Sequence, residues 1–327
     1  MTTKWNFFVS EIEETVNYLN SAIAFESVAD DPYWPKWDTP WWRVMTLFEL
    51  GEIKQVPDKI IDKLIESMDS TYIHFFPFYE KDIPKDCDVY RQIPCHCALG
   101  CIYQALFAYG IDVDERLPWL RPWFLKYQLA DGGFNCDEQA YTNSLKSSMV
   151  STLPPLEAIL YCTEKLTKDE EKLVDKGAQY IINHRLVYTT STQQLMSPSF
   201  MKLSFPRFYD YDFLRGLLYL VRWQKIRQKD YGSDVIALGK KLLKNKGKVS
   251  SLPISDDVSS LNCNDCLCVD TIKLILEKHS YDDSDTLTFD GGKWTWKSPE
   301  IFPLLEEVSK IGNCSYSLLR IYEEIMD

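Results

Sequence analysis

Two groups of cysteines carry the residue types best suited to chemistry. Cys95, His96 and Cys97 are consecutive, and thiolate sulfur and imidazole nitrogen are both ligands that zinc accepts. The segment 262–268 (NCNDCLC) supplies a Cys-x-x-Cys pair, but no second pair stands at the distance typical of a zinc ribbon. For Cys95, His96 and Cys97 the alternatives are a nonmetal pocket and simple packing, because free cysteine is often buried.

The segment 185–215 gathers four cations, which are Arg185, Lys202, Arg207 and Arg215. Arginine can make paired contacts to phosphate oxygens, so these residues, with Tyr211 beside them, are candidates for binding an anionic group. The alternative is that they pair with Asp210 or Asp212 and hold a loop in place.

The aromatic segment DPYWPKWDTPWW contains four tryptophans, Trp34, Trp37, Trp41 and Trp42. They could line the lip of a substrate cavity or form a rim that touches a membrane. Aromatic side chains bury large areas and are used mostly for packing, so the alternative is that they close one end of a helical array.

The charge of the chain excludes one class of partner. With 36 basic and 48 acidic residues the net charge is −12, which opposes nucleic-acid binding because that affinity rests on phosphate contacts. The first residues, MTTKWNFFVSEIEETV, do not read as a signal peptide, and no apolar run is long enough to cross a membrane. We therefore expect a cytoplasmic protein with reduced cysteines.

Helices must position these residues, and residues 94–136 predict a helical hairpin. Apolar residues recur at helical spacing from Leu99 to Tyr109 and the helix ends at Gly110. A second, amphipathic helix follows, capped by Asp112 or Asp114, and ends at Gly132-Gly133. The first helix is apolar nearly all round and the second is striped, which is typical of an inner and an outer helix.

The same pattern recurs along the chain. Inner helices are predicted to start at about residues 41, 95, 147 and 211. Further helices are expected at 4–25, 57–67, 168–184, 232–244, 267–279, 299–311 and 314–326. We expect a single all-α domain over residues 1–327, an α/α toroid of about five to six helical hairpins.

Two pieces of sequence resemble a known superfamily. QLADGGFNC (128–136) followed by STLPPLEAIL (151–160) resembles the repeat of the terpenoid cyclases and protein prenyltransferases, and DGGKW (290–294) is similar to a degenerate second copy. Other stretches resemble bacterial squalene-cyclase-like or prenyltransferase-like toroid proteins. In that repeat Gln128 is expected to bond backbone groups between neighbouring repeats, and the glycines to permit a sharp turn.

The resemblance implies two kinds of chemistry, and neither defining residue set is intact. Cyclases use an acidic DxDD motif, whereas the nearest string here, 112–115 (DVDE), reads as a helix cap. Prenyltransferases hold zinc with Asp-x-Cys at an inner-helix start and a later His. Cys95, His96 and Cys97 occupy a comparable start, and Cys136 or Asp137 would have to complete the ligand set.

The resemblance therefore predicts an isoprenoid-related enzyme or binder, with prenyl transfer or terpenoid cyclisation as its reaction and zinc as the cofactor to test. The ligand would be an apolar small molecule or a prenyl diphosphate. Expected catalytic residues are His96, Cys97, Cys136 and Asp137, and expected ligand-binding residues are Arg185, Arg207, Tyr211, Arg215, Trp41 and Trp42. The alternatives are a non-catalytic toroid that binds a peptide or lipid or serves as a scaffold, and a carbohydrate-active barrel using Asp210 and Asp212.

Overall fold

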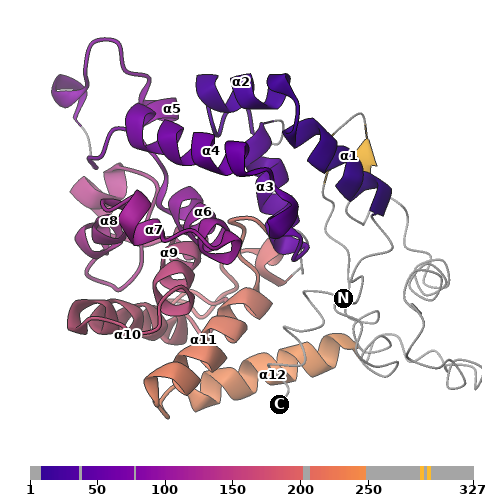
Figure 1. Cartoon of the computed structure of the whole chain (residues 1–327). Helices are drawn as coiled ribbons and strands as arrows, with labels where there is room; N and C mark the ends of the chain where they lie inside the picture. Colours follow the sequence, from indigo (N-terminus) through magenta and orange to yellow (C-terminus); the bar gives the residue numbers. More distant parts are fainter. Residues whose placement is uncertain are drawn as a thin grey trace, which may run out of the picture.

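Helices dominate the chain, as the spacing of its apolar residues predicts. The computed structural model describes residues 9–36, 39–76, 79–201, 207–247, 288–290 and 293–295. Within them lie twelve α-helices (Figure 1). The first six are α1 (Val9–Leu19), α2 (Ala22–Asp30), α3 (Pro40–Glu49), α4 (Asp58–Thr71), α5 (Val89–Gln92) and α6 (His96–Tyr109). The others are α7 (Val113–Arg116), α8 (Leu120–Tyr127), α9 (Met149–Tyr161), α10 (Lys168–Asn183), α11 (Phe213–Arg227) and α12 (Ser233–Gly247).

Short elements fill some of the connections. Three are 3₁₀ turns, at Ile53–Gln55, Glu80–Asp82 and Pro198–Met201, and Ala140–Ser144 is a π-helical turn. Strands β1 (Thr288–Asp290) and β2 (Lys293–Thr295) pair antiparallel, with Phe289 opposite Trp294. The hairpin occupies part of the predicted second repeat copy, and the sequence pattern did not predict strands there.

The helices pack in chain order. Four of them, α3, α6, α9 and α11, contact one another in succession, while α10 contacts both α9 and α8, and α12 contacts α11. Figure 1 shows this succession from α2 and α4 at one end to α11 and α12 at the other. Most residues of α6 and α9 are buried, whereas α10 buries one stripe, so the predicted distinction between inner and outer helices is present in this part of the chain.

Gly100 allows the closest of these contacts. A Cβ atom on Gly100 would lie 2.2 Å from the backbone carbon of Pro154, so α6 and α9 approach at a distance that only glycine permits. Pro154 and Pro155 stand inside α9 without ending it. The predicted helix over 147–163 is thus confirmed despite its two prolines.

Two predicted helices are interrupted. The helix expected over 4–25 is two helices, because Ser21 caps α2 by accepting a hydrogen bond from Ala24 N at 3.2 Å. The outer helix expected after Asp112 is also split, into α7 and α8. Leu117, the residue before Pro118, leaves the helical region at φ −133°, since proline disfavours helical geometry in the residue that precedes it.

Other boundaries agree with the prediction. α6 ends at Gly110 with φ +101°, and Thr167 and Glu170 form a reciprocal capping box at the start of α10. Asp112 accepts a hydrogen bond from Glu115 N at 3.1 Å, so the cap interpretation of the DVDE segment is confirmed.

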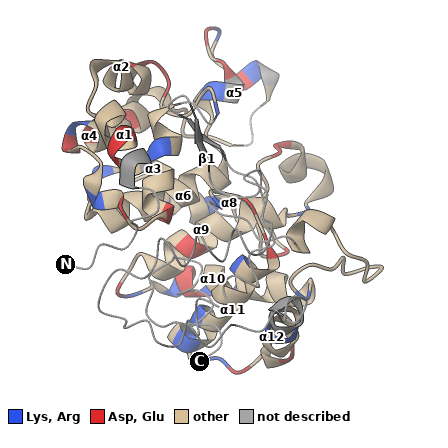
Figure 2. Cartoon of the chain, turned by 90° about the vertical axis from the view of Figure 1, so that its right-hand side faces the viewer, with Lys and Arg blue, Asp and Glu red and all other residues tan. Residues whose placement is uncertain are grey.

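One cluster of buried side chains runs from Ile12 to Ile236. No helix in the described ranges combines the length and the apolar character needed to cross a bilayer. Lys and Arg are spread over several helices and interleaved with Asp and Glu (Figure 2). The helices expected at 267–279, 299–311 and 314–326 lie outside the described residues, so the single domain over 1–327 stays a prediction.

A candidate thiol site at the start of α6

Cys95, Cys97 and Cys136 are brought together by two segments of the chain. Cys95 is the N-cap residue of α6 and Cys97 lies in its first turn. Cys136 lies in the connection between α8 and α9, and its backbone N–H donates to Ser151 Oγ of α9 at 3.2 Å. The three residues therefore meet where the α8–α9 connection crosses the first turn of α6.

The glycine turn before Cys136 sets the position of that connection. Gly132 has φ +102°, and Gln128 Nε2 donates at 2.8 Å both to Gly132 O and to Leu173 O of α10. Phe134 is fully buried, and its backbone pairs with that of Ser148. The role predicted for Gln128 is confirmed. The bonds of Gln128 and the pairing of Phe134 with Ser148 together fix the position of the chain just before Cys136.

The three sulfur atoms form a compact cluster. All three Sγ atoms lie within 4.8 Å of one another, and the Sγ atoms of Cys97 and Cys136 are 3.5 Å apart. Cys97 is buried, while Cys95 and Cys136 are partly exposed. In tetrahedral zinc sites with Zn–S bonds of about 2.3 Å, the sulfur atoms lie roughly 3.8 Å from one another. Small side-chain rotations would therefore bring these three sulfurs to the separation found around a bound zinc ion.

The pKa values of the three thiols are shifted in different directions. Hydrogen bonding with Cys95 and Cys97 holds the pKa of Cys136 well below its usual value. The hydrogen bond to Cys136 in turn raises the pKa of Cys95 to about 12, and it raises the pKa of Cys97 as well. Cys136 is thus the sulfur of the cluster on which negative charge is most favoured.

His96 is not part of this cluster. Its Nδ1 accepts a hydrogen bond from Trp123 Nε1 at 2.8 Å, and its Nε2 lies 3.0 Å from the hydroxyl of Tyr141. The Tyr141 hydroxyl donates to Tyr127 O at 3.0 Å, so Nε2 of His96 carries the proton that completes the chain. Burial lowers the pKa of His96 to about 4.

The structure therefore places His96 outside the group of possible metal ligands that Cys95, Cys97 and Cys136 form. Both ring nitrogens have hydrogen-bond partners, and a ligand role would break at least one buried hydrogen bond. Tyr141, which completes this arrangement, was missed by the sequence analysis, because a tyrosine in a polar loop gives no signal of its own.

Asp137 also lies outside the cluster. Its side chain is exposed, and Oδ1 accepts a hydrogen bond from Gln139 N at 3.0 Å. This contact supports the turn before the π-helical segment. Of the two residues expected to complete the ligand set, the structure brings Cys136 to Cys95 and Cys97 and keeps Asp137 at the surface.

Lys36 and several aromatic rings are neighbours of the thiols. Lys36 Nζ donates to the Tyr209 hydroxyl at 3.2 Å and lies 5.0 to 5.7 Å from the ring centroids of Tyr209, Trp34 and Tyr33. Burial raises the pKa of Tyr33, and the nearby Cys97 and Cys95 raise it further. The positive charge of Lys36 acts on Cys95 in the opposite direction and favours its thiolate.

Lys36 was missed by the sequence analysis, and the signal that could have found it is its place as the one cation within DPYWPKWDTPWW.

Trp41 and Trp42 are packing residues. Both are almost fully buried, and Trp42 Nε1 donates to Tyr33 O at 3.1 Å. The ring of Trp42 makes an edge contact with Phe208 at 5.4 Å. Both side chains thus contribute to packing, and their expected role in lining a ligand site stays a prediction. Trp37 lies outside the described residues.

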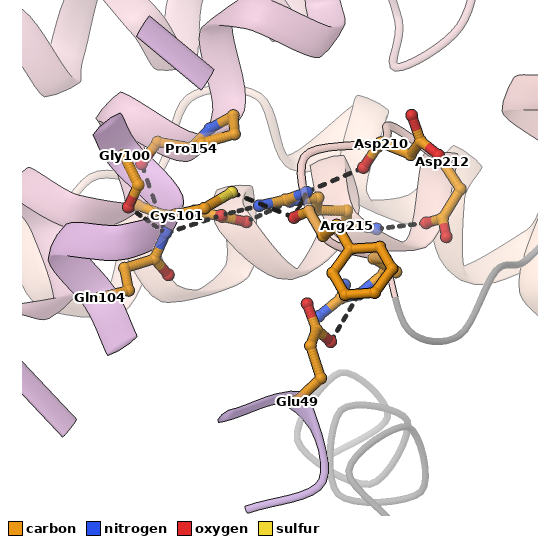
Figure 3. A network of polar contacts seen from close by, with 11 residues as sticks. Glu49, Gly100, Cys101, Gln104, Pro154, Asp210, Asp212 and Arg215 are labelled. Carbon is orange, nitrogen blue, oxygen red and sulfur yellow. Dashed lines mark hydrogen bonds and ion pairs between the residues drawn. The ribbon is translucent and has the colours of Figure 1, made fainter. Parts of the chain in front are cut away.

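Arg215 forms the centre of a separate polar network (Figure 3). Its Nε and Nη2 donate to the two carboxylate oxygens of Glu157 at 2.9 and 2.6 Å. Its Nη1 donates to Phe208 O and Asp210 O at 2.9 and 2.8 Å. Arg215 is almost completely buried, so this arginine fixes the segment before α11 rather than awaiting an anion.

The remaining residues expected to bind an anion have protein neighbours of their own. Arg207 faces the carboxylate of Glu49 at 4.0 Å, and its buried Nε and Nη1 make no hydrogen bond within the described part of the chain. Arg185 pairs loosely with Asp234, and the Tyr211 hydroxyl donates to Leu186 O at 2.7 Å. Carboxylates face all three of the arginines Arg185, Arg207 and Arg215, and Lys202 lies outside the described residues.

Asp212 does not suit the hydrolase alternative. It is fully buried as the N-cap of α11 and accepts a hydrogen bond from Arg215 N at 2.8 Å. Burial raises the pKa of the neighbouring Asp210, but its partner carboxylate is engaged in capping. The cysteines at 263, 266 and 268 lie outside the described residues, and the hypothesis about them stays untested.

Comparison with known proteins adds no assignment to this geometry. No protein family, curated protein or solved structure matches the chain at a significant level. What the fold and the site define is a helical-hairpin protein with a cluster of three cysteine thiols at the start of one buried helix.

Proposed function

We propose that the chain binds a zinc ion through Cys95, Cys97 and Cys136. The observation that carries this proposal is the mutual approach of their three Sγ atoms to within 4.8 Å. Thiolates are preferred zinc ligands, and a set of three protein ligands leaves one position of a tetrahedral ion for a ligand from solution. One of the three sulfurs is already the favoured site of negative charge, which lowers the number of protons that binding must displace.

A site with one open position suits activation of a thiol. An incoming thiol that binds zinc at that position would have its pKa lowered, which would generate a nucleophile at neutral pH. Three thiolates give the loaded site a net charge of −1, and Lys36, whose charge acts on Cys95, would offset part of it. The reaction class that follows is transfer of an alkyl group to sulfur, in which an S–C bond forms and the leaving group departs with its electron pair.

The isoprenoid part of the proposal rests on the resemblance together with the rings near the thiols. Repeats similar to QLADGGFNC occur in protein prenyltransferases, and Tyr33 and Tyr209 are close enough to the thiols to interact with them electrostatically. We further infer that the helical hairpins curve into an α/α toroid, since α3, α6, α9 and α11 follow one another as buried helices. An apolar donor such as a prenyl diphosphate remains the substrate class to test first.

A second candidate is a non-catalytic scaffold. The Arg215–Glu157 pair and the backbone of Phe208 link α6, α9 and α11 through a dense network, in which the Cys101 thiol donates to Phe208 O at 3.2 Å. Because protein groups fill this region between the inner helices, it favours a scaffold over an enzyme with a large substrate cavity. Metal content separates the two candidates.

The deciding experiment is metal analysis of the purified full-length chain. About one zinc ion per chain is expected, and it should be lost in both Cys97→Ser and Cys136→Ser. Cys101→Ser is the matched control, because Cys101 lies one helical turn beyond Cys97 and bonds Phe208 O instead. A variant with serine at positions 263, 266 and 268 should also keep its zinc. Retention of zinc by Cys136→Ser would refute the proposed site.

A further inference from the structure

Cys97 and Cys136 also have the geometry of a dithiol that can be oxidised. Their sulfur atoms are 3.5 Å apart, about 1.5 Å longer than the disulfide bond length of roughly 2.05 Å. The two residues come from different segments of the chain, so a bond between them would join the α8–α9 connection to the start of α6. Rotation about the Cα–Cβ bonds is the kind of movement that such a closure needs.

Access differs between the two sulfurs. Cys136 is partly exposed in the connecting loop, whereas Cys97 is only 7% exposed. A small oxidant arriving from solvent therefore reaches Cys136 first, and Cys97 is held next to it as the thiol that completes the reaction. Cys95, also partly exposed, lies within 4.8 Å of both and can exchange with the resulting disulfide.

We propose that Cys136 is a hydroperoxide-reactive cysteine and that Cys97 resolves its oxidised form into a Cys97–Cys136 disulfide. In the first step the Cys136 sulfur attacks the terminal peroxide oxygen. An S–O bond forms, the O–O bond breaks, and the alcohol or water leaves with the transferred proton. In the second step the Cys97 sulfur attacks the Cys136 sulfenic acid, the S–S bond replaces the S–O bond, and water leaves. Two thiols are oxidised and one hydroperoxide is reduced.

The disulfide would also act on the proposed zinc site, and this consequence rests on the proposed function. Two of the three ligand sulfurs would be consumed, so oxidation would release the metal ion. The oxidation itself needs no metal. A failure of either proposal can therefore be told from a failure of the other.

The test is peptide mapping of the full-length, chelator-treated protein after reaction with one equivalent of hydrogen peroxide. Trypsin leaves Cys95, Cys97 and Cys101 on peptide 92–116 and Cys136 on peptide 127–146. The expected product is these two peptides joined by one disulfide, which fragmentation assigns to Cys97, with the loss of two free thiols per chain. A chain with serine at positions 263, 266 and 268 removes competing thiols from the count.

Two matched variants decide the roles. In a chain with serine at positions 95 and 97 the sulfenic acid of Cys136 should persist and be trapped by dimedone, whereas Cys101→Ser should form the disulfide as the wild-type chain does. Circular dichroism of each reduced variant shows that it is folded. Absence of the crosslinked peptide, or a crosslink through Cys101, would overturn the proposal, even if the protein binds zinc.

Discussion

The indole N–H of Trp123 donates to Nδ1 of His96 at 2.8 Å, deep among aromatic rings. This bond, with the one between Nε2 and Tyr141, fixes one tautomer of a neutral imidazole. His96, which the sequence suggested as a metal ligand, therefore supports the first turn of α6 through its bonds to Trp123 and Tyr141. The thiols on either side of it, Cys95 and Cys97, instead lie close to Cys136.

Replacing His96 by alanine should be strongly destabilising. The change would leave the Trp123 N–H and the Tyr141 hydroxyl without their buried partner and would open a cavity, so we expect a loss of about 2–4 kcal/mol in the free energy of unfolding. Urea denaturation at pH 7 measures it. His74→Ala is the control, since His74 is exposed and stacks on Trp119 at the surface. Equal losses in the two variants would contradict the role given to His96.

The low pKa of His96 makes stability depend on pH. Burial lowers this pKa from 6.5 to about 4, so between these values the unfolded state binds a proton that the folded state does not. The contribution of the neutral His96 to the free energy of unfolding is therefore fully present above pH 6.5. It falls by up to about 3 kcal/mol as the pH drops toward 4. His96→Gln should flatten this part of the curve and leave the slope between pH 7 and 8 unchanged. An unaltered slope between pH 4 and 6.5 would show that another group is responsible.

Gly132 fixes the turn that carries Cys136. Its φ is +102°, and a Cβ atom there would lie 2.3 Å from Lys176 O. Gly132→Ala should cost about 2–4 kcal/mol, the sum of backbone strain and a clash with backbone. Gly51→Ala is a matched control with φ +76° and no atom within 4 Å of its Cβ, so about 1–2 kcal/mol is expected from strain alone. Chemical denaturation of both variants compares the costs, and equal values would rule out the clash.

The buried Arg215–Glu157 pair should behave as a unit. Removing either charge alone, as in Arg215→Met or Glu157→Leu, leaves the other charge buried and should cost about 3–5 kcal/mol. The double variant should recover much of that loss, which a double-mutant cycle measures. Arg116→Ala is the control, because its pair with Asp62 is exposed on both sides and should change stability by less than about 1 kcal/mol. Additive effects of the two buried changes would contradict the coupling.

Local chemistry explains which features the sequence could reveal. Gly110 and Asp112 act through neighbouring backbone, so residue type and spacing were enough to predict the end of α6 and the cap that follows it. The bonding of Gln128 was predicted from the resemblance of its repeat. Long-range pairing left no such signal. The partner of Arg215 is 58 residues away on α9, and it was sought instead among the aspartates next to α11.

The thiol site shows the same limit at closer range. Two of its sulfurs belong to one Cys-x-Cys segment, and the sequence left Cys136 and Asp137 as equal candidates for the third position. Only the turn geometry separates them, because the Asp137 carboxylate accepts from Gln139 N–H while the backbone N–H of Cys136 donates to Ser151 Oγ. The role of His96 depended on Trp123 and Tyr141, which no spacing rule connects to it.

Zinc binding at the three thiols should release two protons near neutral pH. Hydrogen bonds within the cluster lower the pKa of Cys136, while the pKa of Cys95 is raised to about 12 and that of Cys97 is raised too, so binding is expected to displace protons mainly from Cys95 and Cys97. The logarithm of the affinity should then rise by about two for each unit of pH below the Cys95 value. Calorimetric titration with zinc in buffers of different ionisation enthalpy counts the released protons directly. A count of three would mean that Cys136 is protonated in the metal-free protein, and the Cys136→Ser variant should show no zinc-linked release from this site.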